Sequence, residues 1–185
     1  LEIDPTFTSG AGNIRAPYSQ IYNCAVNGGG STTQNYIGAD NYCYKGGAYW
    51  DITSIPDDST ITGVTVSYTH TNDGNNGAMS CDWYSIEGQL STDTWADVWT
   101  DVSDGTSLHT NTCRVTDSTM VMGSDAIADL QAELAIDNEF GIGIDPNQTT
   151  HLAAGSYNTQ YFLSNIILEA TYSFPLVMAD PPTSL

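Results

Sequence analysis

The stretch that decides the fold covers residues 49–70 and reads YWDITSIPDDSTITGVTVSYTH. Its second half alternates strictly, with Val64, Val66 and Tyr68 on one face and Thr or Ser residues on the other. A period of two over β-branched and aromatic residues indicates a half-buried β-strand. Since a polar turn around Asp57 separates this run from a shorter extended one, the stretch predicts a strand, a turn and a second strand.

Similar alternation recurs along the chain, between turns rich in Gly, Asn and Asp. We expect the longest strand where Ile166, Leu168 and Ala170 share one face, and a separate short strand leading from residues 161–163. Eight or so short strands divided by such turns are typical of a two-sheet sandwich of jelly-roll type. The other expected strands fall at residues 13–22, 41–51, 78–90, 114–122 and 140–144.

One segment has the period of a helix instead. Ala126 and Leu130 fall on one helical face, and Ser124 or Asp125 can cap the start of the helix. The segment after residue 90, which contains Trp95 and Trp99, is too irregular to predict a second helix. We therefore predict an all-β, jelly-roll-type β-sandwich with one short inserted helix near residues 124–135.

Composition limits both size and partners. A chain of 185 residues is suited to one domain with a sizeable core. Three Lys and Arg against 22 Asp and Glu give a formal net charge of -19, which repels nucleic acid and anionic membranes. No apolar run approaches the length needed to cross a bilayer, so we expect neither nucleic-acid binding nor membrane insertion. The chain passes from Leu1 directly into polar sequence, as we expect of a secreted chain after removal of its signal segment.

The four cysteines favour disulfides. Cys24, Cys43, Cys81 and Cys113 are even in number and lack both a Cys-x-x-Cys pair and clustered His, so a zinc site is a poor fit. Loop closure favours Cys24 with Cys43 and Cys81 with Cys113, although sequence leaves the other pairings open. Disulfides indicate an extracellular or cell-surface location.

Both ends of the chain are extended. Leu1, Ile3, Pro5 and Phe7 alternate with polar residues, and residues 9–12 provide a small, flexible spacer. This segment is either the first strand of the domain or an arm that adds a strand to a neighbouring subunit. The organisation that we expect is an arm with its spacer, a single β-sandwich domain and an extended tail, at residues 1–12, 13–174 and 175–185.

Residues 45–68, KGGAYWDITSIPDDSTITGVTVSY, resemble the signature of secreted DNRLRE-type and related jelly-roll modules of prokaryotic and viral surface proteins. In those modules a basic residue and Gly lead into an aromatic–Asp pair, then Ser-Ile-Pro, a short acidic or Gly-containing turn and an alternating strand. Here Lys45 stands where the family usually has Arg, and Trp50 where it usually has Phe. The resemblance implies an extracellular structural or carbohydrate-associated module, and it carries no catalytic motif.

The titratable residues predict no enzymatic activity. The sequence has no nucleophile elbow, metalloprotease helix or phosphate loop. Scattered histidines are usually surface residues, and carboxylate pairs within turns are more often solvated than part of a glycoside-hydrolysing site. The candidates weighed here are His70, His109 and His151, the pair Asp57 and Asp58, and the pair Asp137 and Glu139.

Two turns offer hard oxygen ligands, so Ca²⁺ is the one candidate cofactor. These are Asn72, Asp73 and Asn75, and residues 137–139. Neither turn has the complete spacing of a calcium loop, which favours ordinary turns. Asn147 begins the one Asn-x-Ser/Thr acceptor of the sequence and is a candidate for a covalent glycan.

These observations lead to the hypothesis of a secreted structural subunit that polymerises with copies of itself. It would form an extracellular filament, such as a pilus-like fibril, or a surface layer by donating a terminal strand. The alternative is a carbohydrate-binding or adhesive module of a surface protein, in which Trp95, Trp99 and several tyrosines stack on glycans. Most aromatic residues are needed for the core of a β protein this poor in Leu and Phe, which favours the first hypothesis.

Overall fold

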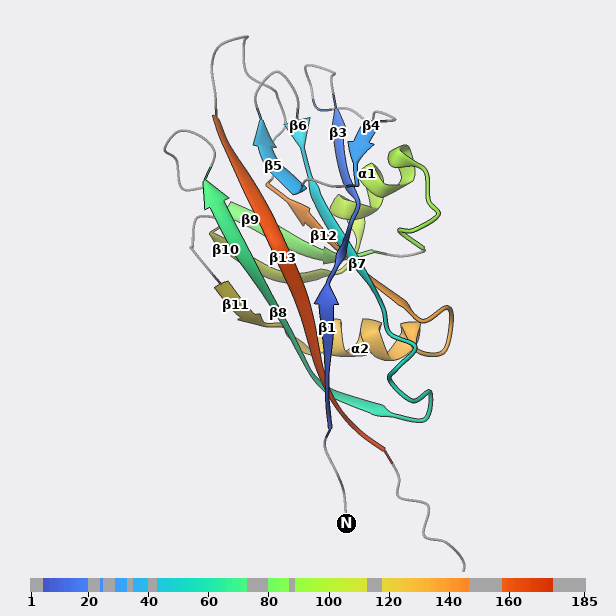
Figure 1. The fold of residues 1–185 in the computed structure, drawn as a ribbon. Helices are drawn as coiled ribbons and strands as arrows, with labels where there is room; N and C mark the ends of the chain where they lie inside the picture. Colours follow the sequence, from blue (N-terminus) through green and yellow to red (C-terminus); the bar gives the residue numbers. More distant parts are fainter. Residues whose placement is uncertain are drawn as a thin grey trace, which may run out of the picture.

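The computed structural model shows a mostly β protein, which confirms the all-β prediction (Figure 1). It describes residues 5–19, 24, 29–32, 35–39, 43–72, 80–86, 89–112, 118–146 and 158–174. The strands within these ranges are β1 (Thr6–Ala11), β2 (Asn13–Ile14), β3 (Ala16–Ser19), β4 (Gly29–Ser31), β5 (Asn35–Ala39), β6 (Cys43–Tyr44), β7 (Gly46–Asp51), β8 (Thr60–Asn72), β9 (Ser80–Ser85), β10 (Ser107–Thr112), β11 (Ser118–Val121), β12 (Glu139–Asp145) and β13 (Asn158–Ser173). The helices are α1 (Trp95–Asp104) and α2 (Ser124–Glu133).

The strands form two antiparallel sheets. The eight-stranded sheet has the order β11-β8-β13-β5-β6-β3-β4, with β1 also paired to β13. The five-stranded sheet has the order β10-β9-β12-β7-β2. Figure 1 shows β8 and β13 running side by side along the length of the molecule, with β1 beside β13.

Residues 49–70 form the predicted strand, turn and strand, but the two strands lie in different sheets. Because β7 belongs to the five-stranded sheet and β8 to the eight-stranded sheet, the turn carries the chain across the core. Ile52 and Ile55 are buried within this turn. Asp51 Oδ1 accepts hydrogen bonds from the hydroxyl and the backbone N–H of Thr53, at 2.6 and 2.9 Å, and these bonds lower the pKa of Asp51.

The main core lies between the sheets. Val64, Val66 and Tyr68 of β8 are buried, as their alternation predicts. Tyr68 stacks on Trp83 of β9 in the opposite sheet, with ring centroids 5.3 Å apart. Since burying one large apolar side chain contributes about 1.5–3 kcal/mol, this layer supplies much of the stability of the fold.

Strand β12 packs differently on its two faces. Its glycines, Gly141 and Gly143, face away from the main core toward α1 and the turn before it. A Cβ at either glycine would lie 2.7 Å from an atom of Leu90 or of Val102, so a larger residue would push this layer off the sheet. The buried residues on the other face are Phe140, Ile142 and Ile144.

Helix α1 shows that the prediction of a single helix was wrong. Thr94 Oγ1 accepts a hydrogen bond from the Asp97 N–H, and the Asp97 carboxylate accepts one from the Thr94 N–H, which completes a capping box. Val98 and Val102 are buried against the outer face of the five-stranded sheet. Aromatic, Thr, Ser and Asp residues have modest helix propensity, so this helix depends on its cap and on its packing.

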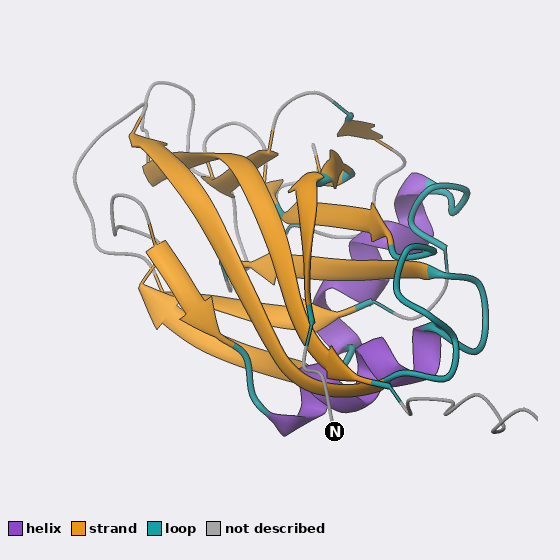
Figure 2. Cartoon of the chain, turned by 60° about the horizontal axis from the view of Figure 1, so that its bottom comes forward, coloured by secondary structure: helices purple, strands orange, loops and turns teal. Residues whose placement is uncertain are grey.

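Helix α2 confirms the helix predicted near residues 124–135. Ala126 and Leu130 are buried in the main core, and the helix closes one end of it (Figure 2). The predicted caps, Ser124 and Asp125, are wrong, since Gly123 occupies the N-cap position and makes no side-chain cap. Burial of the apolar face therefore stabilises α2 without an N-terminal cap.

Gln131 joins α2 to the turn before β8. Its Oε1 accepts a hydrogen bond from the Ile61 N–H at 2.9 Å, and its Nε2 donates one to the Ser59 carbonyl at 3.0 Å. One side chain thus satisfies two backbone groups where the chain enters β8.

Several predicted boundaries differ in the structure, including that of the strand predicted at 41–51, which divides into β6 and β7 in opposite sheets. β13 is the longest strand, as predicted, but it also includes residues 161–163, because a register shift between Ser164 and Ile167 interrupts the alternation without ending the strand. The strand predicted at 13–22 divides into β2 and β3, which lie in opposite sheets. The spacer predicted at 9–12 is part of β1 as far as Ala11.

We expect Thr94→Ala to lower the free energy of unfolding by about 1 kcal/mol, because it removes the side-chain acceptor of the capping box. Thr100→Ala in the same helix is the matched control, since Thr100 is exposed and its hydroxyl donates to the Ala96 carbonyl within the helix, away from the cap. Urea denaturation of both variants measures the difference. Equal losses in the two variants would show that the cap does not stabilise α1.

Candidate functional site

The candidate site is the edge of the eight-stranded sheet formed by β1. Its register with β13 places Thr6 opposite Thr171, Phe7 opposite Ala170 and Thr8 opposite Glu169. Among the described strands β1 pairs with β13 alone, so no described strand covers its second edge. β1 can therefore be removed with the loss of a single ladder.

The ladder between β1 and β13 contains an irregularity after Thr8. The Ser9 hydroxyl accepts a hydrogen bond from the Leu168 N–H at 2.9 Å and donates one to the Gly10 carbonyl at 2.6 Å. Regular pairing resumes at Ala11, and the Gly12 N–H donates to the Ile166 carbonyl at 2.7 Å. A side chain thus satisfies the backbone group that the shift in register would leave without a partner.

The predicted arm residues are divided by the structure. Phe7 packs against the main core, and Pro5 is half-buried at the start of β1. The Pro5 carbonyl accepts a hydrogen bond from the Tyr172 N–H at 3.2 Å. Leu1 and Ile3 lie outside the described residues. Phe7 is therefore the apolar anchor of β1.

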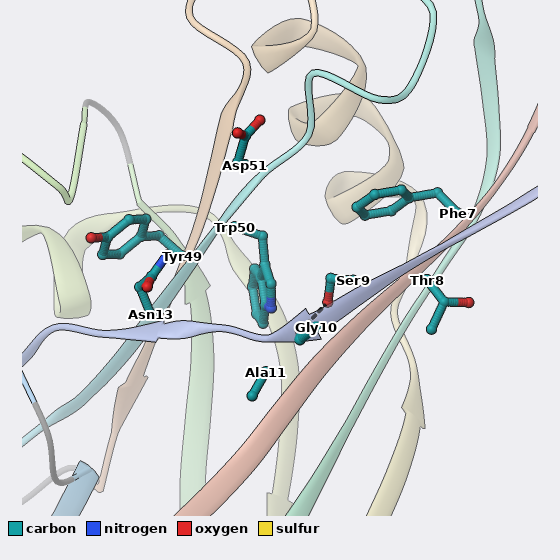
Figure 3. Close-up of a pocket in the computed structure, with 9 residues that line it drawn as sticks. All are labelled: Phe7, Thr8, Ser9, Gly10, Ala11, Asn13, Tyr49, Trp50 and Asp51. Carbon is teal, nitrogen blue, oxygen red and sulfur yellow. Dashed lines mark hydrogen bonds between the residues drawn. The ribbon is translucent and has the colours of Figure 1, made fainter.

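A pocket of about 250 Å³ lies between β1 and β7 (Figure 3). Trp50 of β7 forms part of its wall, and the indole Nε1 is buried without a hydrogen-bond partner. The same ring packs against Phe140, with centroids 6.3 Å apart. The residues that line the pocket are Phe7, Thr8, Ser9, Gly10, Ala11, Asn13, Tyr49, Trp50 and Asp51.

Gly12 allows β1 to approach Trp50. A Cβ at this position would lie 2.7 Å from Nε1 of the indole, closer than nonbonded atoms tolerate. At Gly10 a Cβ would meet no atom within 4 Å. A side chain at position 12 would therefore collide with Trp50, whereas a side chain at position 10 would be accommodated.

We expect Gly12→Ala to destabilise the protein by about 1–3 kcal/mol, because the added methyl group displaces either Trp50 or the end of β1. Gly10→Ala is the matched control and should remain close to the wild type. Urea denaturation gives the loss, and hydrogen exchange of the Leu168 amide reports whether β1 has separated from β13. A Gly10→Ala variant as unstable as Gly12→Ala would contradict this packing.

Carboxylates also gather around the C-terminal half of α2. Burial raises the pKa of Glu133 to about 7, with further contributions from a hydrogen bond to Asp137 and from the negative charges of Asp137, Asp129 and Glu139. Asp129 and Glu133 line a second pocket, of about 190 Å³. Within the described residues, no three His, Cys, Asp or Glu side chains are arranged to hold a metal ion.

Glu133 should make stability depend on pH. Between its ordinary value near 4.5 and its folded value near 7, the folded protein retains a proton that the unfolded chain has lost. Stability from this group therefore falls as the pH rises through that window. We expect Glu133→Gln to reduce this slope in thermal unfolding measured from pH 5 to 8. Glu169→Gln, which removes an exposed carboxylate of β13, controls for the loss of one charge, and equal slopes in the two variants would contradict the assignment.

The tryptophans proposed for sugar stacking contact cations of the same chain. The Arg15 guanidinium lies 4.1 Å from the centroid of the Trp95 ring, and the Lys45 ammonium lies 4.6 Å from that of the Trp99 ring. Trp99 is also buried against the Cys24–Cys43 disulfide. These two rings therefore hold α1 against neighbouring segments.

The disulfide between Cys24 and Cys43 confirms the first predicted pair. Cys81 is also disulfide-bonded, and Cys113 lies outside the described residues. Neither described helix has the length and apolar character needed to cross a membrane.

The first predicted calcium turn and the predicted glycan acceptor stay predictions. Asp73, Asn75 and Asn147 lie outside the described residues, and Asn72 is described only as the last residue of β8.

The alternative calcium turn is occupied by internal hydrogen bonds. Asp137 Oδ1 accepts from the Glu139 N–H at 3.0 Å, and Glu139 Oε1 accepts from the Ser91 N–H at 3.0 Å. The Asp137 bond is local to the turn, whereas the Glu139 bond joins the turn to the segment before α1, so the acidic pair proposed for glycoside hydrolysis has structural partners. Of the remaining titratable candidates, Asp57 and Asp58 lie exposed in the turn before β8. His109 is half-buried in β10. His70 is described only through its place in β8, and His151 lies outside the described residues.

A scan against protein-family models and a search of the curated proteins found no match to this chain. The resemblance of residues 45–68 to DNRLRE-type modules therefore stays a prediction from the motif.

Proposed function

We propose that the chain is a secreted structural subunit of an extracellular filament, such as a pilus-like fibril, or of a surface layer. Copies of the chain join when each donates β1 to its neighbour. The observation that carries the proposal is the position of β1, which is the first described strand, an edge of its sheet and separated from β7 by an open pocket. Such a strand can be exchanged without rearrangement of the central strands.

The strand order supports a jelly-roll fold for this subunit. With β2 to β6 set aside, the sheets read β1-β13-β8-β11 and β7-β12-β9-β10. Two Greek keys that fold into a jelly roll produce this order. β1 is then the first of eight strands, and β2 to β6 are an insertion between the first strand and the second.

The edge of β13 favours exchange between identical chains. When β1 is absent, backbone groups along residues 166–172 of β13 lose their partners. An open edge of this kind binds another extended segment. Since β1 of a second copy has the same sequence, it can restore the ladder and place its own Phe7 in the core.

The disulfides support secretion, because bonds such as Cys24–Cys43 persist in oxidising compartments. The alternative of a carbohydrate-binding module has less support. Of the four tryptophans, Trp50, Trp83 and Trp99 are buried, and Trp95 lies against Arg15. None of them presents an open strip of aromatic rings for a glycan.

A pair of cysteines at Thr8→Cys and Glu169→Cys tests strand donation, because these residues lie opposite each other and are exposed. If β1 is donated, the new disulfide joins successive subunits, and assembled material gives a ladder of bands on a non-reducing denaturing gel. The ladder should collapse to the monomer after reduction.

The control for this test is Thr65→Cys with Glu169→Cys, a pair within the β8–β13 ladder that stays in one chain in either arrangement. It should give only the monomer band from the same assemblies. Polymers, seen by electron microscopy, in which the Thr8→Cys pair closes only within single chains would contradict donation of β1. A protein that remains monomeric at high concentration would contradict the filament itself.

A further inference from the structure

The only lysine of the sequence is buried. Lys45 follows β6 and is 7% exposed, in a chain that has 22 acidic residues and places few positive charges at its surface. Lysine is rarely buried unless its charge is paired. The buried ammonium group of Lys45 therefore requires partners that stabilise its charge.

Lys45 and Asp145 are in direct contact. The Lys45 Nζ lies 3.0 Å from Asp145 Oδ2, and Asp145 is 6% exposed at the end of β12. Nζ also donates a hydrogen bond to the Trp99 carbonyl at 3.3 Å and lies over the Trp99 ring. Helix α1 thus covers the pair and excludes water from it.

A second carboxylate stands beside the pair. Asp82 of β9 is directly opposite Asp145 of β12, so the two side chains lie on the same face of the sheet, with Cβ atoms about 5 Å apart. Thr110 Oγ1 donates to Asp82 Oδ1 at 2.6 Å, and Tyr84 is also hydrogen-bonded to Asp82. Asp145 therefore has the Lys45 amine in direct contact with it and a second carboxylate, that of Asp82, opposite it on the neighbouring strand.

We propose that Lys45 and Asp145 condense into an intramolecular isopeptide bond. A proton passes from Nζ to Asp145 Oδ2, and the freed lone pair of Nζ attacks Cγ of Asp145. Asp82 then takes a second proton from the nitrogen and returns it to Oδ2. The Nζ–Cγ bond has formed, the Cγ–Oδ2 bond breaks, one water leaves, and Asp82 ends in its starting state, so no oxidant or co-reactant is needed.

The environment favours this condensation. Two buried charges carry a desolvation cost that a neutral amide does not have. Groups held in contact react with effective molarities that reach about 10⁵–10⁸ M, and the covered site limits the reverse attack by water. The product would tie the start of β7 to the end of β12 covalently, in addition to the disulfide that lies on the same side of α1.

Trypsin digestion of the reduced, denatured protein tests the bond, using folded full-length chain from a host without N-glycosylation. Cleavage after Arg15, Lys45 and Arg114 normally separates residues 16–45, 46–114 and 115–185. An isopeptide blocks cleavage at Lys45 and leaves 16–114 joined to 115–185, with a mass lower than their sum by one water. Separate peptides with an unmodified Lys45 would overturn the proposal.

Two variants define the mechanism. Lys45→Arg keeps the positive charge but cannot form the amide, so it should yield separate peptides and the full sequence mass. Loss of water from this variant too would place the dehydration elsewhere, such as at an Asp-Gly pair, and overturn the proposal. Asp82→Asn should slow condensation after refolding by about 100-fold, the scale of general acid–base catalysis, and an unchanged rate would overturn the role of Asp82.

Discussion

The backbone ladder between β8 and β13 is the interaction on which the rest of the structure depends. It extends from Thr60 to Asn72 along β8 and satisfies backbone groups that the core would otherwise leave without partners. The inner faces of the same strands carry Val64, Val66 and Leu168 into the core. Each strand then offers its other edge to further strands, β8 to β11 and β13 to β5 and β1. The eight-stranded sheet therefore grows from this ladder, and the five-stranded sheet packs against the side chains that it presents.

Features that depend on neighbouring residues could be predicted from the sequence, and features that depend on contacts between distant residues could not. Alternation is a local property, so the strand around Val66 and the helix around Leu130 could be predicted from neighbouring residues. The assignment of β7 and β8 to opposite sheets depends on distant partners, and no short pattern encodes it. Helix α1 did leave a local signal, the spacing of Thr94 and Asp97 before two valines, but aromatic residues obscured its period. The contact of Lys45 with Asp145 could not be predicted at all, because it joins residues far apart in the chain.

Two of the three basic residues of this acidic chain have a common role. Arg15 and Lys45 come from separate segments, and each lies over a tryptophan of α1, at Trp95 and Trp99. These tryptophans are four residues apart, so both rings project from the same side of the helix. A cation beside an aromatic face is attracted even where water is excluded, which makes it a suitable contact for a helix with a modest propensity of its own, in the case of Lys45 before its proposed condensation. Trp95 and Trp99 thus each stabilise the position of α1 through a contact with a basic residue from another segment.

The single residue between β1 and β2 has a consequence for the mechanics of an assembly. Only Gly12 separates the end of β1 from Asn13, which is already paired with Tyr49 of β7 in the opposite sheet. Six residues of extended chain span about 20 Å. In a polymer joined through β1, the acceptor strand of the next subunit would have to lie within that distance of the donor's own sheet, with no slack linker between them. Such a joint resists bending and transmits tension directly from backbone to backbone, so the fibre would behave as a stiff rod rather than as beads on a flexible string.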